Sequence, residues 1–141
     1  MKTLLLIALL SLSLLGDEYT AKVKILDSIF SQTSIKQDLT FWSDNKMILS
    51  QLQNNHNVTN DCNKATFLII ENKRHVPKRC LEKQVYIFVL DYKLLSKIPQ
   101  SFGALFWKKA RANIVILKPR IKSQNITISD NLKSYLEDQI W

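Results

Sequence analysis

Glycine and proline are both scarce in this chain. Its 141 residues include only two glycines and three prolines. With Gly16 and Gly103 as the only glycines, the glycine-rich loops that bind nucleotide phosphates or dinucleotides are excluded. The same scarcity argues against a sandwich or barrel, because folds with many tight turns need these residues.

Cysteine and histidine are equally rare, with two residues of each. An even number of cysteines suits one disulfide in an oxidising compartment, so we predict a Cys62–Cys80 bridge. The two are too far apart in sequence for a C-x-x-C redox pair. The alternative is zinc held by His56, Cys62, His75 and Cys80, but their spacings match no compact zinc motif. We therefore expect no metal site.

Motifs for catalysis are also missing. There is no G-x-S-x-G sequence, and neither histidine has a recognisable catalytic context. The adjacent carboxylates Glu137 and Asp138 are expected on the solvated face of a terminal helix. We predict a protein that is not an enzyme and that needs no cofactor.

The amino terminus has the pattern of a signal peptide. Met1 and Lys2 precede an apolar run, residues 4–15, that only serines interrupt, and Gly16 follows. This run is too short for a membrane-spanning helix and suits a signal segment. The alternative is a buried helix, but the run has no polar face. We expect cleavage after residue 16, export to the periplasm, no membrane span after cleavage, and one domain over residues 17–141.

The formal net charge is +8. An excess of positive charge is typical of proteins that bind nucleic acid, anionic lipid or an acidic partner, and it also occurs on surfaces that are only solvated. An exported protein rarely meets nucleic acid. For most of these charges we favour the solvated surface. The basic residues form one distinct cluster in the sequence: Lys108, Lys109, Arg111, Lys118, Arg120 and Lys122.

Three segments have helical patterns. Apolar residues recur at helical spacing over residues 19–35 and again over residues 47–52, where Ser43 or Asp44 is the expected cap. A last helix is expected to begin at Ser129.

Strand patterns alternate with these helices. Residues 65–70 and 85–90 are continuous apolar runs, typical of strands buried on both faces. Residues 38–43 predict a shorter strand. Residues 104–117 form two apolar runs joined by a polar segment, which predicts a β-hairpin whose loop, lacking glycine, is irregular. The fold class is therefore α/β: one three-layer domain with a mixed sheet, a C-terminal β-hairpin and a final helix.

The hairpin resembles a segment of small, exported, uncharacterised bacterial proteins. The sequence from Gly103 to Ile114, G-A-L-F-W-K-K-A-R-A-N-I, is similar to their G-A-F-F-W-Q-K-G-R-P-N-I. Ala110 and Ala112 stand where that pattern has Gly and Pro. The resemblance extends over roughly residues 62–137 through the order of its cysteines and strands.

More distantly, the order of elements and Gly103 resemble the YfiR-type periplasmic regulators. These proteins bind the periplasmic domain of an inner-membrane signalling enzyme, and their fold is similar to one lobe of a solute-binding protein. The resemblance implies a non-enzymatic regulatory or sensory protein that binds a partner, such as the periplasmic domain of a membrane sensor. The alternative is a solute-binding type of protein that holds a small anion near residues 103–111.

The candidate binding residues for a ligand or partner are Trp107, Lys108, Lys109, Arg111 and Gly103. An aromatic ring beside a cationic loop can hold an anionic ligand or the acidic face of a partner, and a guanidinium pairs with carboxylate or phosphate through two donors. The alternative is that Phe106 and Trp107 fill the core and the cations only solvate the hairpin tip.

Overall fold

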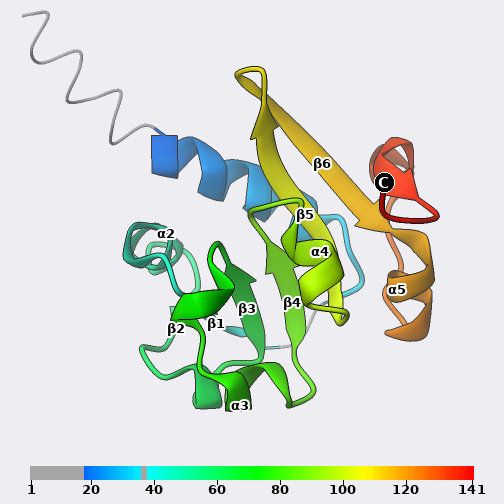
Figure 1. The fold of residues 1–141 in the computed structure, drawn as a ribbon. Coiled ribbons are helices and arrows are strands. Elements are labelled where there is room, and N and C mark those ends of the chain that lie inside the picture. The colour runs from blue at the N-terminus through cyan, green and yellow to red at the C-terminus, as the bar shows by residue number, and fades with distance from the viewer. Residues whose placement is uncertain (1–17, 36–37) are drawn as a thin grey trace, which may run out of the picture.

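The structure, a computed structural model, describes residues 18–35 and 38–141. The predicted signal peptide, residues 1–16, therefore lies outside the described residues. The described chain begins with a helix over residues 18–31 and continues into a sheet flanked by short helices (Figure 1). No helix in these two stretches combines the length and apolar character that a bilayer crossing requires.

The sheet of the described chain has seven strands in the order β2-β1-β3-β4-β5-β6-β7. Strands β2, β1, β3, β4 and β5 are parallel to their neighbours, β6 is antiparallel to β5, and β7 is parallel to β6. The strand bounds are β1 Thr40–Ser43, β2 Asn57–Val58, β3 Phe67–Ile70, β4 Tyr86–Val89, β5 Ser101–Lys108, β6 Arg111–Leu117 and β7 Leu136–Glu137. The predicted α/β fold with a mixed sheet and a C-terminal hairpin is confirmed.

Helical segments cover both faces of the sheet, with a separate hydrophobic core on each side (Figure 1). The helix over residues 18–31 packs on one face together with α2 and α5, and the other face is covered by α4, α3 and the 3₁₀ helix η1. The bounds are α2 Lys46–Leu52, η1 Cys62–Lys64, α3 Lys78–Leu81, α4 Leu94–Lys97 and α5 Lys118–Ser123. This arrangement has the three expected layers.

Strand β3 is buried along its whole length, as its continuous apolar sequence predicts. Phe67 and Ile69 enter one core, whereas Leu68 and Ile70 enter the other, because successive side chains of a strand point to opposite faces. The first core is rich in phenylalanine, and the Phe67 ring lies 4.6 Å from that of Phe30 between ring centres. Each such buried ring stabilises the fold by about 2–3 kcal/mol.

The hairpin loop is shorter than expected. Only Lys109 and Ala110 separate β5 from β6, with φ angles of 52° and 60°. The prediction of an irregular loop is wrong, because a two-residue turn with both φ angles positive matches the twist of the paired strands even without glycine. The turn closes directly on the pair Lys108 and Arg111.

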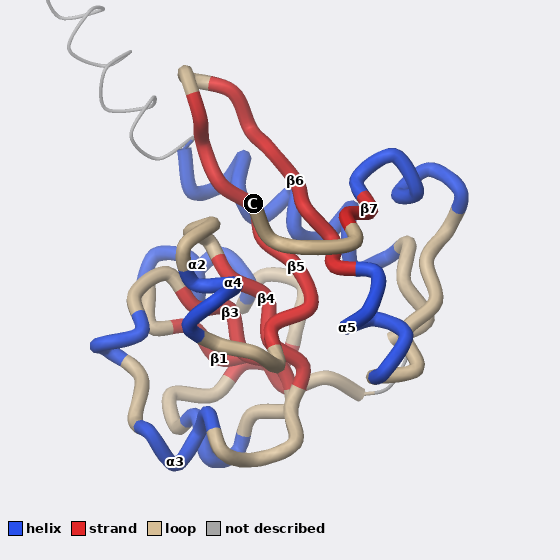
Figure 2. The backbone as a smooth tube through the Cα atoms, turned by 45° about the vertical axis from the view of Figure 1, so that its right-hand side comes forward, coloured by secondary structure: helices blue, strands red, loops and turns tan. Residues whose placement is uncertain are grey.

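The carboxyl-terminal segment follows the expected helix only in part. The 3₁₀ helix η3 (Asp130–Tyr135) begins after Ser129, and β7 follows at once and pairs with the end of β6 at Ile116 and Leu117 (Figure 2). Helix α5, with a proline in its first turn, was not predicted, and neither was β2, which lies in a polar loop.

Cys62 and Cys80 form a disulfide, as predicted. Cys62 lies in η1, which leads into β3, and Cys80 lies in α3, which leads into β4. The bridge therefore joins the segments that enter two adjacent strands, at the amino end of the parallel sheet.

Candidate functional site at the carboxyl edge of the sheet

The parallel strands β1, β3, β4 and β5 all end at one edge of the sheet, opposite the disulfide. The order β2-β1-β3-β4-β5 is that of a doubly wound sheet. After β1 the chain turns to α2 on one face, whereas after β4 it turns to α4 on the other. In such sheets ligands bind outside the carboxyl ends of the strands where the winding reverses, here between β1 and β3.

A cleft of about 1040 Å³ lies at this position, and we call it the edge cleft. Carboxylates and cations both line it. The carboxylates come from the residues that follow the strands, Asp44, Glu71 and Asp91, and the cations are Lys46, Lys73, Arg74 and Lys97. Because side chains of both charges line the cleft, its electrostatics do not favour anions over cations.

Asp44 connects the ends of β1 and β3. Its Oδ1 atom accepts a hydrogen bond of 2.8 Å from the backbone N–H of Glu71, and its Oδ2 atom accepts one of 2.8 Å from that of Asn72. Burial raises the pKa of Asp44 above its ordinary value, although the backbone donors oppose this shift. Both carboxylate oxygens are thus occupied in holding the two strand ends together.

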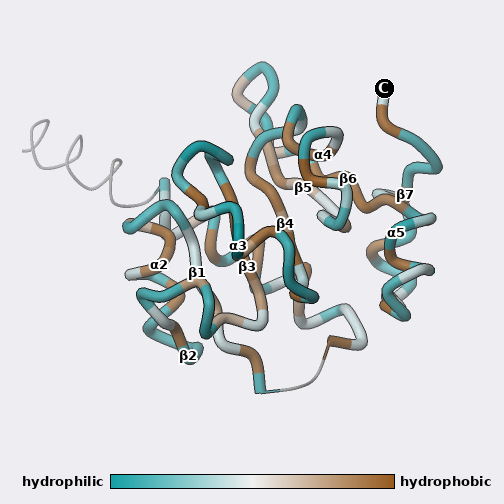
Figure 3. Tube along the Cα trace, turned by 60° about the horizontal axis from the view of Figure 1, so that its bottom comes forward, coloured by the Kyte–Doolittle hydropathy of each residue, from teal (hydrophilic) through white to brown (hydrophobic). Residues whose placement is uncertain are grey.

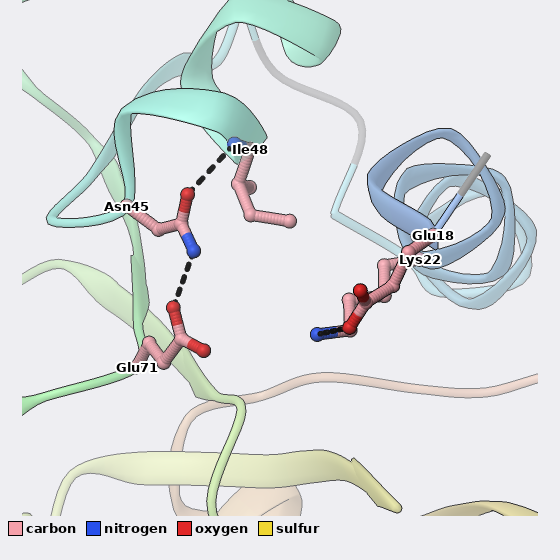
Figure 4. Close-up of polar contacts among 5 residues, drawn as sticks. All are labelled: Glu18, Lys22, Asn45, Ile48 and Glu71. Atoms are coloured by element: carbon pink, nitrogen blue, oxygen red, sulfur yellow. Dashed lines mark hydrogen bonds and ion pairs between the residues drawn. The ribbon is translucent and has the colours of Figure 1, made fainter. Parts of the chain in front are cut away.

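Asn45 caps helix α2 and completes this connection (Figure 4). Its side-chain oxygen accepts hydrogen bonds from the backbone N–H groups of Met47, at 2.9 Å, and Ile48, at 3.1 Å, while its Nδ2 atom donates to the Glu71 carboxylate. The expected cap at Ser43 or Asp44 is wrong: the Ser43 hydroxyl is buried and accepts from the Asn45 N–H, and Asp44 bonds across the sheet.

A second depression of about 680 Å³ shares Glu71 and Asp91 with the edge cleft and extends to the hairpin. We call it the aromatic groove, because its other lining residues include Tyr92, Phe106, Trp107 and Trp141, with Lys93 and Lys108 beside them. The rings of Tyr92 and Phe106 lie 5.2 Å apart between centres. The backbone N–H of Trp141 donates to the Tyr92 hydroxyl at 2.6 Å, which places the tryptophan in the groove.

Trp107 lies between the two alternatives that the sequence left open. Its side chain is 43% exposed, so it does not fill the core. The ammonium of Lys22, on the helix over residues 18–31, lies 5.3 Å from the centre of the indole ring and 3.3 Å from the carboxylate of Glu18. This cation–π contact places the indole on the face of the sheet that the helix over residues 18–31 covers, whereas Phe106, the preceding residue of β5, packs on the other face.

Lys108, Lys109 and Arg111 are all exposed at the end of the hairpin. In Figure 3 the tip of the β5–β6 hairpin is hydrophilic, whereas the central strands are mostly hydrophobic. Within residues 18–35 and 38–141, none of these three cations takes part in an ion pair. The structure therefore brings four of the five predicted residues, Trp107 and these cations, onto one projecting element.

Gly103 lies apart from them, buried inside β5. A Cβ atom at this position would stand 2.7 Å from Cε2 of Phe88 and 2.7 Å from the backbone oxygen of Val115. Both distances are too short for carbon. The absence of a side chain at Gly103 thus lets β5 pack against its two neighbouring strands.

Arg120 differs from the other members of the basic cluster. Its Nη1 atom donates hydrogen bonds to the backbone oxygens of Leu95, at 2.7 Å, and Ser101, at 2.9 Å, and lies 3.3 Å from that of Ile98. Burial lowers the pKa of the guanidinium. Arg120 therefore fixes the connection between α4 and β5, the base of the hairpin, a role that the sequence pattern did not reveal.

Three of the four residues of the zinc alternative are engaged elsewhere. Both cysteine sulfurs belong to the disulfide, and Nε2 of His56 lies 2.6 Å from Oδ1 of Asp27. Among the residues that the structure describes, no three His, Cys, Asp or Glu side chains gather in a way that could hold a metal ion.

Comparison of the chain with protein-family models, with curated proteins and with solved structures found no significant match.

Proposed function

We propose that this chain is an exported, non-enzymatic regulatory or sensory protein that binds a protein partner. The binding surface consists of the aromatic groove and the cations at the hairpin tip, Lys108, Lys109 and Arg111. The resemblance to the YfiR-type regulators suggests the kind of partner: the periplasmic domain of a membrane signalling protein. The disulfide supports export, because such bridges persist in oxidising compartments.

The main support is the exposed aromatic surface beside Lys108, which takes part in no ion pair among the described residues. Trp107 is 43% exposed and Trp141 81% exposed, and both line the groove next to Lys108. Aromatic residues and arginine are enriched in protein interfaces, where a few of them provide most of the binding energy. The exposed cations of the hairpin tip, Lys108, Lys109 and Arg111, favour an acidic partner and raise the rate of encounter.

Site-specific photo-crosslinking in the producing cell tests this proposal. A photoreactive amino acid at Lys108 stands at the groove, whereas one at Lys64 is also exposed but lies in η1, at the amino end of the sheet. We expect the Lys108 probe to yield one specific adduct that mass spectrometry identifies as a membrane signalling protein, and the Lys64 probe to yield none. Identical adducts from both positions, or no adduct at Lys108, would contradict the proposal.

The alternative function is a small-molecule binding protein, and the edge cleft favours it. The cleft has the position and the size of a ligand site in a doubly wound sheet. Thermal unfolding with a panel of small anions and zwitterions tests this alternative: a compound that stabilises the protein, and no longer does so after Arg74→Ala, supports it. Arg111→Ala is the matched control, because it removes the same charge outside the cleft.

A further inference from the structure

The outer edge of β6 is only partly covered. Strand β6 runs from Arg111 to Leu117 and pairs with β5 from Arg111 to Ile116. On its other side β7 pairs only with Ile116 and Leu117. In the described part of the chain, no strand lies beside the first five residues of β6, and Figure 2 shows this half extending beyond β7.

The ladder determines which backbone groups face outward from this edge. In an antiparallel pair, alternate residues bond to the partner strand, and those between them direct N–H and C=O away from it. Lys108 and Arg111 close the turn as a bonded pair, so Asn113 and Val115 also bond to β5. The backbone groups of Ala112 and Ile114 therefore point outward.

The residues along this edge include small and β-branched side chains. Ala112 is exposed, and Ile114 is half-buried. At the ends of the edge stand Lys109, Arg111 and Lys118, which are exposed and, among residues 18–35 and 38–141, take part in no ion pair. An open edge with β-branched residues is a template for strand pairing.

We infer that the partner adds an extended acidic segment as a strand along β6, next to Ala112 and Ile114. This inference rests on the proposed function and specifies its geometry. Main-chain hydrogen bonds to Ala112 and Ile114 provide the pairing, and carboxylates near both ends of the segment pair with Arg111 and Lys118.

A second copy of this chain fits the edge less well than an acidic segment. Each copy carries a formal net charge of +8 and the same cations beside β6, so two such edges repel one another. An acidic strand gains electrostatic attraction from the same residues. The occupant we assign is therefore a heterologous acidic segment.

A short capped peptide that alternates valine and threonine between terminal glutamates is a suitable probe, with its lysine-for-glutamate counterpart as the control. We expect the acidic peptide to shift the NMR signals of the Ala112 and Ile114 amides and the lysine peptide to leave them unchanged. The absence of these shifts at millimolar acidic peptide overturns the inference, and so does equal binding of both peptides. If the protein alone dimerises, and the dimer protects the Ala112 and Ile114 amides from hydrogen exchange, the assigned occupant is wrong.

Ala112→Pro removes the outward N–H without breaking a bond to β5. It should weaken acidic-peptide binding about tenfold or more, whereas Ala112→Thr, which keeps the N–H, should bind like the unmodified protein. Unchanged binding by a folded Ala112→Pro protein refutes strand addition. If that variant fails to fold, Arg111→Glu tests the inference instead. It should shift the binding preference from the glutamate peptide towards the lysine peptide, and an unchanged preference refutes the inference.

The photo-crosslinking experiment separates this inference from the proposed function. If the Lys108 probe still captures the same partner in an Ala112→Pro background with undiminished yield, the partner binds without strand addition and only the present inference fails. If the unmodified protein captures no partner, the proposed function fails, and the peptide titration still reports whether the edge accepts a strand.

Discussion

Ala110 is the residue at which the hairpin should gain stability from a single substitution. Its φ angle is 60°, in the left-handed region, where an L-residue with a Cβ atom costs roughly 1–2 kcal/mol relative to glycine. Glycine relieves this strain but adds about 0.4–1 kcal/mol of conformational entropy to the unfolded chain. We therefore expect Ala110→Gly to raise the free energy of unfolding by about 0.5–1 kcal/mol.

Ala112→Gly is the matched control, because it makes the same chemical change two residues away. Ala112 lies within β6 and is not among the described residues with positive φ, so glycine there should destabilise the protein by about 0.5–1 kcal/mol. Urea titration of both variants and the parent protein measures the two shifts in midpoint at constant slope. Equal destabilisation by both substitutions would refute the assignment of left-handed strain to Ala110.

Three further predictions concern the sheet and its carboxyl edge. Gly103→Ala should lower the free energy of unfolding by about 1–3 kcal/mol in denaturant titration, because its Cβ atom clashes with Phe88 and with backbone; unchanged stability contradicts the packing. Arg111→Ala should weaken partner binding more than Arg111→Lys, with melting temperatures unchanged, whereas Trp107→Ala should lower both affinity and melting temperature; intact binding in Arg111→Ala refutes the site. NMR titration of the Asp44 carboxyl should give a pKa above 3.8, so its contribution to stability falls as pH rises from below 3.8 through that pKa; a value at or below 3.8 contradicts the burial effect.

The layers and central strands could be predicted from sequence because hydrophobic patterns determine them. The continuous apolar runs around β3 and β4 identified strands buried on both faces, and the helical spacing of residues 19–35 identified most of the first helix. Burial of apolar surface is a large, non-directional contribution, so local sequence reports it well. The short elements β2, β7 and α5 have no such pattern, because long-range pairing or packing stabilises them.

The cap of α2 and the type of hairpin turn could not be predicted from local sequence, because tertiary hydrogen bonds determine them. Ser43, Asp44 and Asn45 are all good capping residues. Asn45 is the cap because the Asp44 carboxylate instead accepts hydrogen bonds from the backbone just after β3. The turn at Lys109 and Ala110 forms without glycine because the six residue pairs between β5 and β6 outweigh its local strain.

The candidate site was visible in sequence only along the β5–β6 hairpin. Trp107, Lys108, Lys109 and Arg111 are neighbours in the chain, so their proximity needed no tertiary information. The rest of the aromatic groove comes from Tyr92 and Trp141, which are 49 residues apart and meet through one hydrogen bond. No periodicity in the sequence encodes that contact.

The two ends of the sheet have different mechanical roles. At the amino end the disulfide joins the segments that enter β3 and β4, and Arg120 fixes the α4–β5 connection at the base of the hairpin. The hairpin tip, in contrast, bears exposed cations. Substitutions at the base should therefore change stability more than affinity, whereas substitutions at the tip should change affinity more than stability. This separation would let the tip present backbone and charge to the proposed partner while the core stays unchanged.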